Sequence, residues 1–198
     1  VFLFPAFTAG PIERFDHYLA ARETRLSKEA IAEGLSRIIV GLVKFLVIAQ
    51  MVMVLIFGQR TMVELLYDFN TLGAWDVWKF MIAAYLQMYL GFSAYTDLAI
   101  GASRLFGLKI AENFNWPIFA SNITEFWKRW HMSLANWCMT YIYMPTLGKW
   151  RNPNIASYLT FIIVSIWHAG ALPWIAWGLY HASGLAAYQW WGKYRRQK

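Results

Sequence analysis

The sequence predicts an all-α, polytopic integral membrane protein with re-entrant segments. Hydrophobic residues make up 59% of the chain and charged residues 15%, whereas about a quarter of the residues in a soluble domain are charged. The mean hydropathy is +0.35. Several apolar runs are long enough to cross a hydrocarbon core of about 30 Å, and short polar clusters separate them.

The distribution of charge along the chain favours a membrane protein over a nucleic-acid-binding protein. The net charge is +7, but the basic residues lie in short clusters between apolar runs. This arrangement is typical of the positive-inside rule and argues against a nucleic acid partner. The single cysteine, Cys138, excludes an intrachain disulfide. No spacing of Cys and His residues resembles a metal site, so we expect none.

The first 37 residues are expected at the membrane surface. Residues 1–11 are apolar but interrupted by Pro5, Gly10 and Pro11, which indicates a re-entrant or interfacial piece. Residues 13–37 hold five basic and five acidic residues. They predict a helix on the cytoplasmic surface, with Ser27 as an N-cap.

Two spans are predicted next. Residues 35–57 form the clearest apolar run; Lys44 within it either snorkels or forms an ion pair. Residues 58–76 contain one arginine and three acids and should lie on the far side. Residues 78–102 form the second span. On it Gly91 and Ala94 are small enough for a neighbouring helix to approach.

The segment at residues 104–151 holds six basic residues and is predicted to return to the cytoplasmic side. Within it, residues 120–137 are expected to form one half-inserted helix, too polar to span the bilayer. Asn122 with Glu125 gives a capping box, and Glu125 with Arg129 an i,i+4 pair. One face of this helix holds four apolar side chains beside His131: Trp127, Trp130, Leu134 and Trp137.

Residues 154–172 and 174–191 are the third and fourth predicted spans, and a basic tail follows them. The loop charges place both ends of the chain on the cytoplasmic side. At about 1.5 Å per residue, His168 would lie about 20 Å along the third span, past the middle of the bilayer.

The four histidines differ in their surroundings. His168 follows a tryptophan within an apolar run, and an ionisable side chain there is a functional candidate by default. For His131, a functional and a structural role are both open. A structural role is favoured for His181, and His17 lies in a charged surface segment. No serine or cysteine belongs to a nucleophile motif, so a histidine base would suit direct transfer between two bound substrates.

Seven motifs in order along the chain resemble the membrane-bound O-acyltransferases, in the bacterial branch of alginate O-acetyltransferases and D-alanyl-teichoic-acid transfer proteins. They are FPAFTAGPIERF (4–15), YLGFSAYTDLAIGASRLFG (89–107), ENFNWP (112–117), FWKRWHMSL (126–134), YIYMP (141–145), IWHAG (166–170) and WGLYH (177–181). We expect residues 1–198 to be part of such a catalytic core within a longer protein.

The resemblance implies a bundle of tilted helices around a thinned centre, where a funnel and a tunnel bring together an acyl donor on the cytoplasmic side and a hydroxyl on the other side. His168 matches the essential histidine of the family and His131 the second histidine. His168 would remove a proton from the hydroxyl as it attacks the acyl thioester. Eight further residues within or beside the matching motifs are candidates for the tunnel wall: Trp127, Trp130, Asn113, Asn115, Tyr89, Asp97, Tyr141 and Trp167.

The sequence departs from the family's usual pattern at three places, and these bear on the acyl donor. Gly91 stands where the family commonly has an acid, and Ala94 where it has a glycine. Met139 and Thr140 replace the usual Arg-Asp pair before Tyr141. The usual double glycine after Pro145 is also missing.

The expected function is O-acyl transfer, most simply of acetyl, to an exported or cell-surface polysaccharide by a multi-pass protein of the inner or plasma membrane. The donor would be acyl-CoA or an acyl-carrier thioester, with no bound cofactor. Partners would be membrane lipid, the polysaccharide and an accessory periplasmic or extracellular transferase. D-alanyl transfer from a carrier protein is the alternative. A transporter or channel is the rival of another class, but the halves of the chain show no internal repeat.

Overall fold

The computed structural model describes residues 6–7, 9–21, 26–58 and 60–197. These residues form helices and connecting turns, with no strand among them. The chain divides into two compact units, Val1–Asn113 and Phe114–Lys198. Residues 1–5 and 8 fall outside the described part, so most of the predicted re-entrant piece does too.

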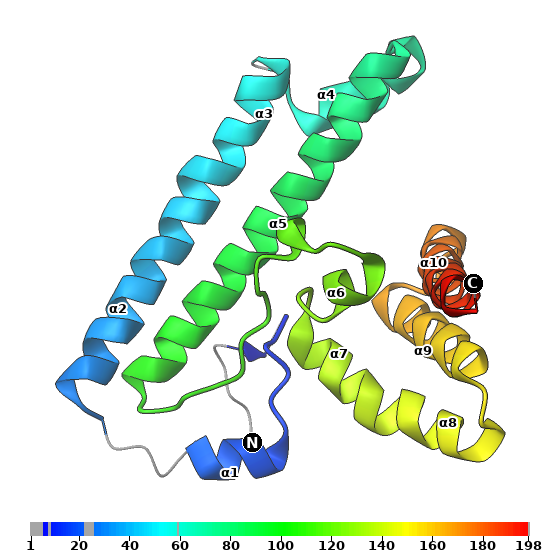
Figure 1. The fold of residues 1–198 in the computed structure, drawn as a ribbon. Helices are drawn as coiled ribbons and strands as arrows, with labels where there is room; N and C mark the ends of the chain where they lie inside the picture. The colour runs from blue at the N-terminus through cyan, green and yellow to red at the C-terminus, as the bar shows by residue number, and fades with distance from the viewer. Residues whose placement is uncertain (1–5, 8, 22–25, 59, 198) are drawn as a thin grey trace. The chain divides into compact units, whose positions relative to one another are not determined.

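The first unit is built on two long helical segments that lie side by side (Figure 1). One is continuous from Lys28 to Phe57 and the other is α5. The elements of this unit are α1 (Phe15–Ala21), α2 (Lys28–Val43), the π-helical turn η2 (Lys44–Ile48), α3 (Ala49–Phe57), α4 (Met62–Tyr67), the 3₁₀ turn η3 (Phe69–Thr71) and α5 (Ala74–Leu105).

The start of α2 is capped as predicted, because the Ser27 hydroxyl accepts a hydrogen bond from the Ala30 N–H at 3.1 Å. Close contact between α2 and α5 depends on glycines. A Cβ on Gly34 would lie 2.9 Å from the Gly101 carbonyl oxygen, and one on Gly41 would lie 2.9 Å from that of Ala94. The two helices therefore pack backbone against backbone, and Ala94 is fully buried there. Gly91 is not at this contact, since no described neighbour lies within 4 Å of its Cβ position.

By length and composition, one helical segment among the described residues could cross a membrane, namely Lys28–Phe57. It contains the predicted span 35–57. Large apolar side chains are exposed along its length, including Ile39, Leu46 and Leu55. Helices are also present at the other three predicted spans, 78–102, 154–172 and 174–191, but they do not pass the same test.

Among its described residues, the second unit begins with the 3₁₀ turn η4 (Pro117–Phe119), and six helical segments follow it. They are α6 (Ile123–Trp127), α7 (Met132–Cys138), the π-helical turn η5 (Met139–Tyr143), α8 (Met144–Trp150), α9 (Pro153–His168) and α10 (Leu172–Arg196). Figure 1 shows α9 and α10 next to each other, and they make the most extensive helix contact of this unit. Cys138 packs with Ile142 and Val164 in its buried core.

Residues 120–137 form two helices instead of the single one that the sequence predicts. Asn122 does cap the first, with its side-chain oxygen accepting the Glu125 N–H at 2.9 Å. The break comes after Trp127 and ends at His131, whose backbone is left-handed, with φ 44°. In the break the Arg129 carbonyl accepts a hydrogen bond from the Asn115 N–H. Glu125 pairs with Lys128 at 2.9 Å, whereas the prediction paired it with Arg129.

The helix α9 ends at His168, four residues before the end of the predicted span. The reason is local, because Gly170 has φ +65° and its N–H returns to the Ser165 carbonyl. This glycine termination is a common C-cap. It leaves His168 on the last turn of the helix, directly before the turn into α10.

Candidate functional site

His168 is held in a defined orientation at the end of α9. Its Nδ1 lies 2.8 Å from the Val164 carbonyl oxygen, so Nδ1 donates in the tautomer that has its proton there. Nε2 then has a free lone pair and can accept a proton. The ring stacks on Trp174, with centroids 4.5 Å apart and an interplanar angle of 18°. Trp167 meets it edge-on at 4.8 Å.

His131 is buried, with 7% of its surface exposed, at the first turn of α7. The left-handed backbone at this residue turns the chain sharply between α6 and α7. His131 lines a cavity together with Val164, the residue whose carbonyl holds the His168 ring 37 positions later in the sequence than His131. Both predicted catalytic residues therefore belong to the second unit.

A cavity of about 390 Å³ lies within the second unit. Its wall is mainly apolar, with a few polar groups, and it receives side chains from α6, α7, α9 and α10. Residues that line it, from these helices and from the break between α6 and α7, include Trp127, Trp130, His131, Cys138, Ser157, Thr160, Phe161, Val164, Leu185 and Gln189. An apolar pocket with few polar groups is typical of a small-molecule site. Val164, whose carbonyl holds His168, is part of this wall.

Next to the cavity, four aromatic rings surround His181 on α10. The His181 ring meets Trp127 edge-on at 5.0 Å, Trp177 at 4.9 Å and Tyr180 at 5.3 Å, and it stacks on Phe161 at 6.1 Å. Its Nδ1 is buried and makes no hydrogen bond to any described residue. The sequence favoured a structural role for His181. The sequence feature that could have drawn attention to His181 is the glycine three residues away on either side, Gly178 and Gly184.

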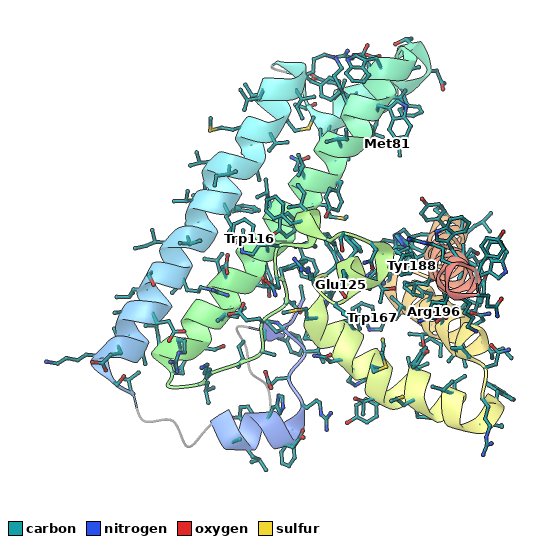
Figure 2. The ribbon with its side chains drawn as sticks, viewed as in Figure 1. Met81, Trp116, Glu125, Trp167, Tyr188 and Arg196 are labelled. Atoms are coloured by element: carbon teal, nitrogen blue, oxygen red, sulfur yellow. The ribbon has the colours of Figure 1, made fainter. Side chains whose placement is uncertain are left out.

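The predicted tunnel residues of the second unit fall into two groups. Trp127 and Trp130 line the cavity. Asn115 and Tyr141 are exposed, as is Trp167, which Figure 2 labels and which is 61% exposed. Asn115 donates its backbone N–H to the Arg129 carbonyl, and so holds the break before His131.

The remaining three tunnel candidates belong to the first unit. Asn113 is completely buried and Tyr89 is partly buried. Asp97 is buried between two cations. Its Oδ2 lies 2.6 Å from Lys44 Nζ and its Oδ1 lies 2.9 Å from Arg37 Nε. Lys44 therefore forms the ion pair that was one of its two predicted roles.

Arg37 also pairs with Glu112, so two cations and two carboxylates balance within this network. These ion pairs are sufficient to explain why the Asp97 carboxylate is buried. Among the described residues no three His, Cys, Asp or Glu side chains are placed to hold a metal ion.

Comparison with known proteins supplies the family. A sequence model of the membrane-bound O-acyltransferase family matches residues 1–197. The probable alginate O-acetylase of Pseudomonas aeruginosa is 34% identical over 191 residues, which cover 94% of this chain and 35% of that protein. The peptidoglycan O-acetyltransferase of Helicobacter pylori is 33% identical over 198 residues, with coverage of 96% and 36%.

The teichoic acid D-alanyltransferase of Bacillus subtilis is 30% identical over 212 residues, which cover 100% of this chain and 52% of that protein. The chain thus spans between 35% and 52% of the length of these three relatives. Because the family match extends over nearly every residue and includes both histidines, the chain belongs to the membrane-bound O-acyltransferase family.

Proposed function

We propose that this chain forms part of the active site of a multi-pass O-acyltransferase of the inner or plasma membrane. The reaction is transfer of an acyl group from a thioester donor to a hydroxyl of an exported or cell-surface polysaccharide. The observation that supports it best is the state of His168. Its Nδ1 is engaged by the Val164 carbonyl, which leaves Nε2 as a proton acceptor, and Val164 lines the same cavity as the buried His131.

In this mechanism His168 Nε2 accepts the proton of the acceptor hydroxyl while the hydroxyl oxygen attacks the thioester carbonyl carbon. A C–O bond forms, and the tetrahedral intermediate then expels the thiolate as the C–S bond breaks. The thiolate takes the proton from His168, so the products are an ester and a free thiol. General-base catalysis of this kind contributes about 10² to 10⁴ in rate. Holding both substrates in one geometry adds more through effective molarity.

His131 is proposed to orient a substrate in the cavity, because it is part of the wall together with Val164, whose carbonyl holds His168. Trp127, Trp130 and the apolar side chains around them would exclude water from the reacting thioester. Exclusion of water protects an activated acyl group from hydrolysis. The donor would be acyl-CoA or an acyl-carrier thioester.

Acetyl is the first candidate for the acyl group, because two of the relatives are named as O-acetylating proteins and act on alginate and peptidoglycan. D-alanyl is the second candidate, because the teichoic acid D-alanyltransferase of Bacillus subtilis matches along the whole chain. An accessory transferase outside the cell membrane would complete acetyl transfer to a distant polymer. The helices at 78–102, 154–172 and 174–191 would accompany Lys28–Phe57 across the bilayer, with α6 and α7 half-inserted.

The test uses the full-length protein in membranes with cell-surface glycan and either labelled acetyl or labelled D-alanyl thioester. Transfer by the wild type is compared with transfer by His168→Gln at matched protein level. Glutamine retains hydrogen bonding but cannot act as a base near neutral pH. The matched control is His17→Gln, in the exposed part of α1. Loss of transfer only in His168→Gln is expected. Full transfer by His168→Gln would remove the proposed base.

A further inference from the structure

Two polar atoms of the second unit are buried without a protein partner, and they belong to neighbouring rings. They are Trp127 Nε1 and His181 Nδ1, neither of which bonds to a described residue. The rings meet edge to face, with centroids 5.0 Å apart and planes at 88°. Leaving a buried N–H unpaired costs free energy. Groups of this kind in a native protein therefore need an explanation.

The position of His181 is fixed by packing on both sides. A Cβ on Gly178 would lie 2.8 Å from the Phe161 carbonyl oxygen on α9, and one on Gly184 would lie 2.9 Å from Ile123 Cδ1 on α6. Three residues separate His181 from each glycine. The imidazole therefore lies where α6, α9 and α10 meet, and these contacts restrict how far α10 can move to expose it.

The same rings lead to the proposed base. Trp177 contacts His168 at 5.9 Å, Trp127 at 5.7 Å and His181 at 4.9 Å, measured between ring centroids. One indole thus touches the base and both residues with unpaired atoms. Trp127 also lines the cavity. Two of the rings around His181, those of Trp127 and Phe161, line the cavity, so the unpaired atoms adjoin the cavity that we propose to hold the thioester.

We propose that Trp127 Nε1–H and His181 Nδ1–H bind the carbonyl oxygen of the acyl thioester and stabilise its negative charge in the tetrahedral intermediate. Tryptophan Nε1 can only donate, and histidine Nδ1 donates in the tautomer that has its proton there. The oxygen gains charge as the C–O bond forms and returns to a carbonyl as the C–S bond breaks, so neither donor loses its proton. This assignment rests on the proposed acyl transfer.

The surroundings favour such a role. Donors that are fixed in a water-poor, aromatic site stabilise charge more strongly than they would in water. The buried Phe161 and the partly buried Trp177 provide such a site around the buried His181 Nδ1. An unpaired donor in the resting protein is also what this function requires, because its partner arrives only with the substrate.

The experiment measures kcat and KM for donor and acceptor in the full-length protein, with Trp127→Phe and His181→Phe as the variants. Both substitutions keep a ring and remove the N–H. Removing one donor of this kind lowers kcat by roughly 100-fold or more, and we expect that loss with both KM values nearly unchanged. Both substitutions also change the packing of a ring, so the thermal midpoint is measured and kcat is compared at a temperature at which every variant is folded. His181→Asn, whose amide can place an N–H near the Nδ1 position, should recover part of kcat. Trp190→Phe, at the exposed end of α10, is the matched control.

Several results would overturn the assignment. Unchanged kcat in both phenylalanine variants would exclude the pair from the reaction. A raised KM for the acceptor alone would assign the two atoms to the acceptor hydroxyl. A lower thermal midpoint with no recovery in His181→Asn would make His181 structural. A failure of this assignment can be told apart from a failure of the proposed function. If the wild type transfers acyl groups and His168→Gln does not, an unchanged kcat in the Trp127 and His181 variants refutes only the oxyanion assignment.

Discussion

Gly178 is the residue at which α10 touches the backbone of α9, and Gly178→Ala tests whether that contact positions the histidines. The new Cβ would lie 2.8 Å from the Phe161 carbonyl oxygen and would also overlap the Ser165 hydroxyl. Neither atom can move freely, since Ser165 is fully buried and donates to that same carbonyl at 2.8 Å. Adding atoms to a packed site of this kind costs about 1–3 kcal/mol.

The matched control is Gly192→Ala on the same helix, where no described neighbour lies within 4 Å of the Cβ position. Alanine in an open helix position gains up to about 1 kcal/mol over glycine. Both glycines lie within α10, so this gain is common to the two variants and they should differ by the packing cost alone, about 1–3 kcal/mol. Gly192→Ala should be the more stable protein and Gly178→Ala the less stable.

The assay is reversible denaturation of the purified full-length protein in detergent, followed by tryptophan fluorescence, with acyl transfer measured on the same preparations. Gly178→Ala should also lose transfer, because Trp177 and His181 flank the displaced contact. Ser165→Ala in the Gly178→Ala background should restore only part of the stability, since the Phe161 carbonyl remains in place. If Gly178→Ala raises stability as much as Gly192→Ala does, the close approach of α9 and α10 is refuted.

Three other predictions concern regions outside the second unit's core or the topology of the whole chain. Asp97→Asn leaves Arg37 and Lys44 without their shared carboxylate and should lower the free energy of unfolding by about 3 kcal/mol, near the lower end for a broken buried pair because both cations are partly exposed. Asp76→Asn, at the exposed pair with Lys79, should change it by less than about 0.5 kcal/mol. Equal effects of the two substitutions would contradict the buried network. The pKa of Glu64 is lowered by hydrogen bonds from the backbone and the side chain of Thr61. The stabilisation of α4 is therefore complete above the ordinary value of 4.5 and is lost as the pH falls through the lower folded-state pKa. The hydrogen-exchange protection factors of residues 62–67 should fall on acidification in the wild type, and above pH 4.5 they should be lower in Thr61→Ala than in the wild type, because that variant keeps only the backbone hydrogen bond. A cysteine at Gly73 should react with an impermeant thiol reagent from outside intact cells, whereas one at Gly148 should react only after permeabilisation, and the reverse pattern would invert the proposed topology.

The sequence was informative where a local pattern determines the structure. The apolar run at residues 35–57 lies in one helix, and Ser27 and Asn122 cap helices as expected. These features depend on neighbouring residues only. The motifs also identified the family, which the comparison confirms.

Features that depend on distant residues could not be predicted in the same way. The helical spacing of Trp127, Trp130, Leu134 and Trp137 continues through the break, so it predicted one helix where there are two. The interruption accompanies a hydrogen bond from Asn115, fourteen positions before Arg129. Lys44 likewise had two possible roles until its partner Asp97, on another helix, was placed. The surroundings of His181 arise from three helices, and no single segment contains them.

The π-helical turn at Lys44–Ile48 affects how the helix Lys28–Phe57 keeps one side against α5. An α-helix advances about 100° per residue, so residues seven apart lie within about 20° of one angular position. Gly34 and Gly41 are such a pair, and Ile48 would continue the row. Instead, Ala49 is buried and Ile48 is exposed. The wider turn accommodates one additional residue. The buried side of α3 therefore begins one residue later in the sequence, at Ala49, than an unbroken α-helix would place it. A deletion of a single residue within 44–48 should therefore be tolerated better than an insertion there, because it would restore an unbroken α-helix with the same buried side.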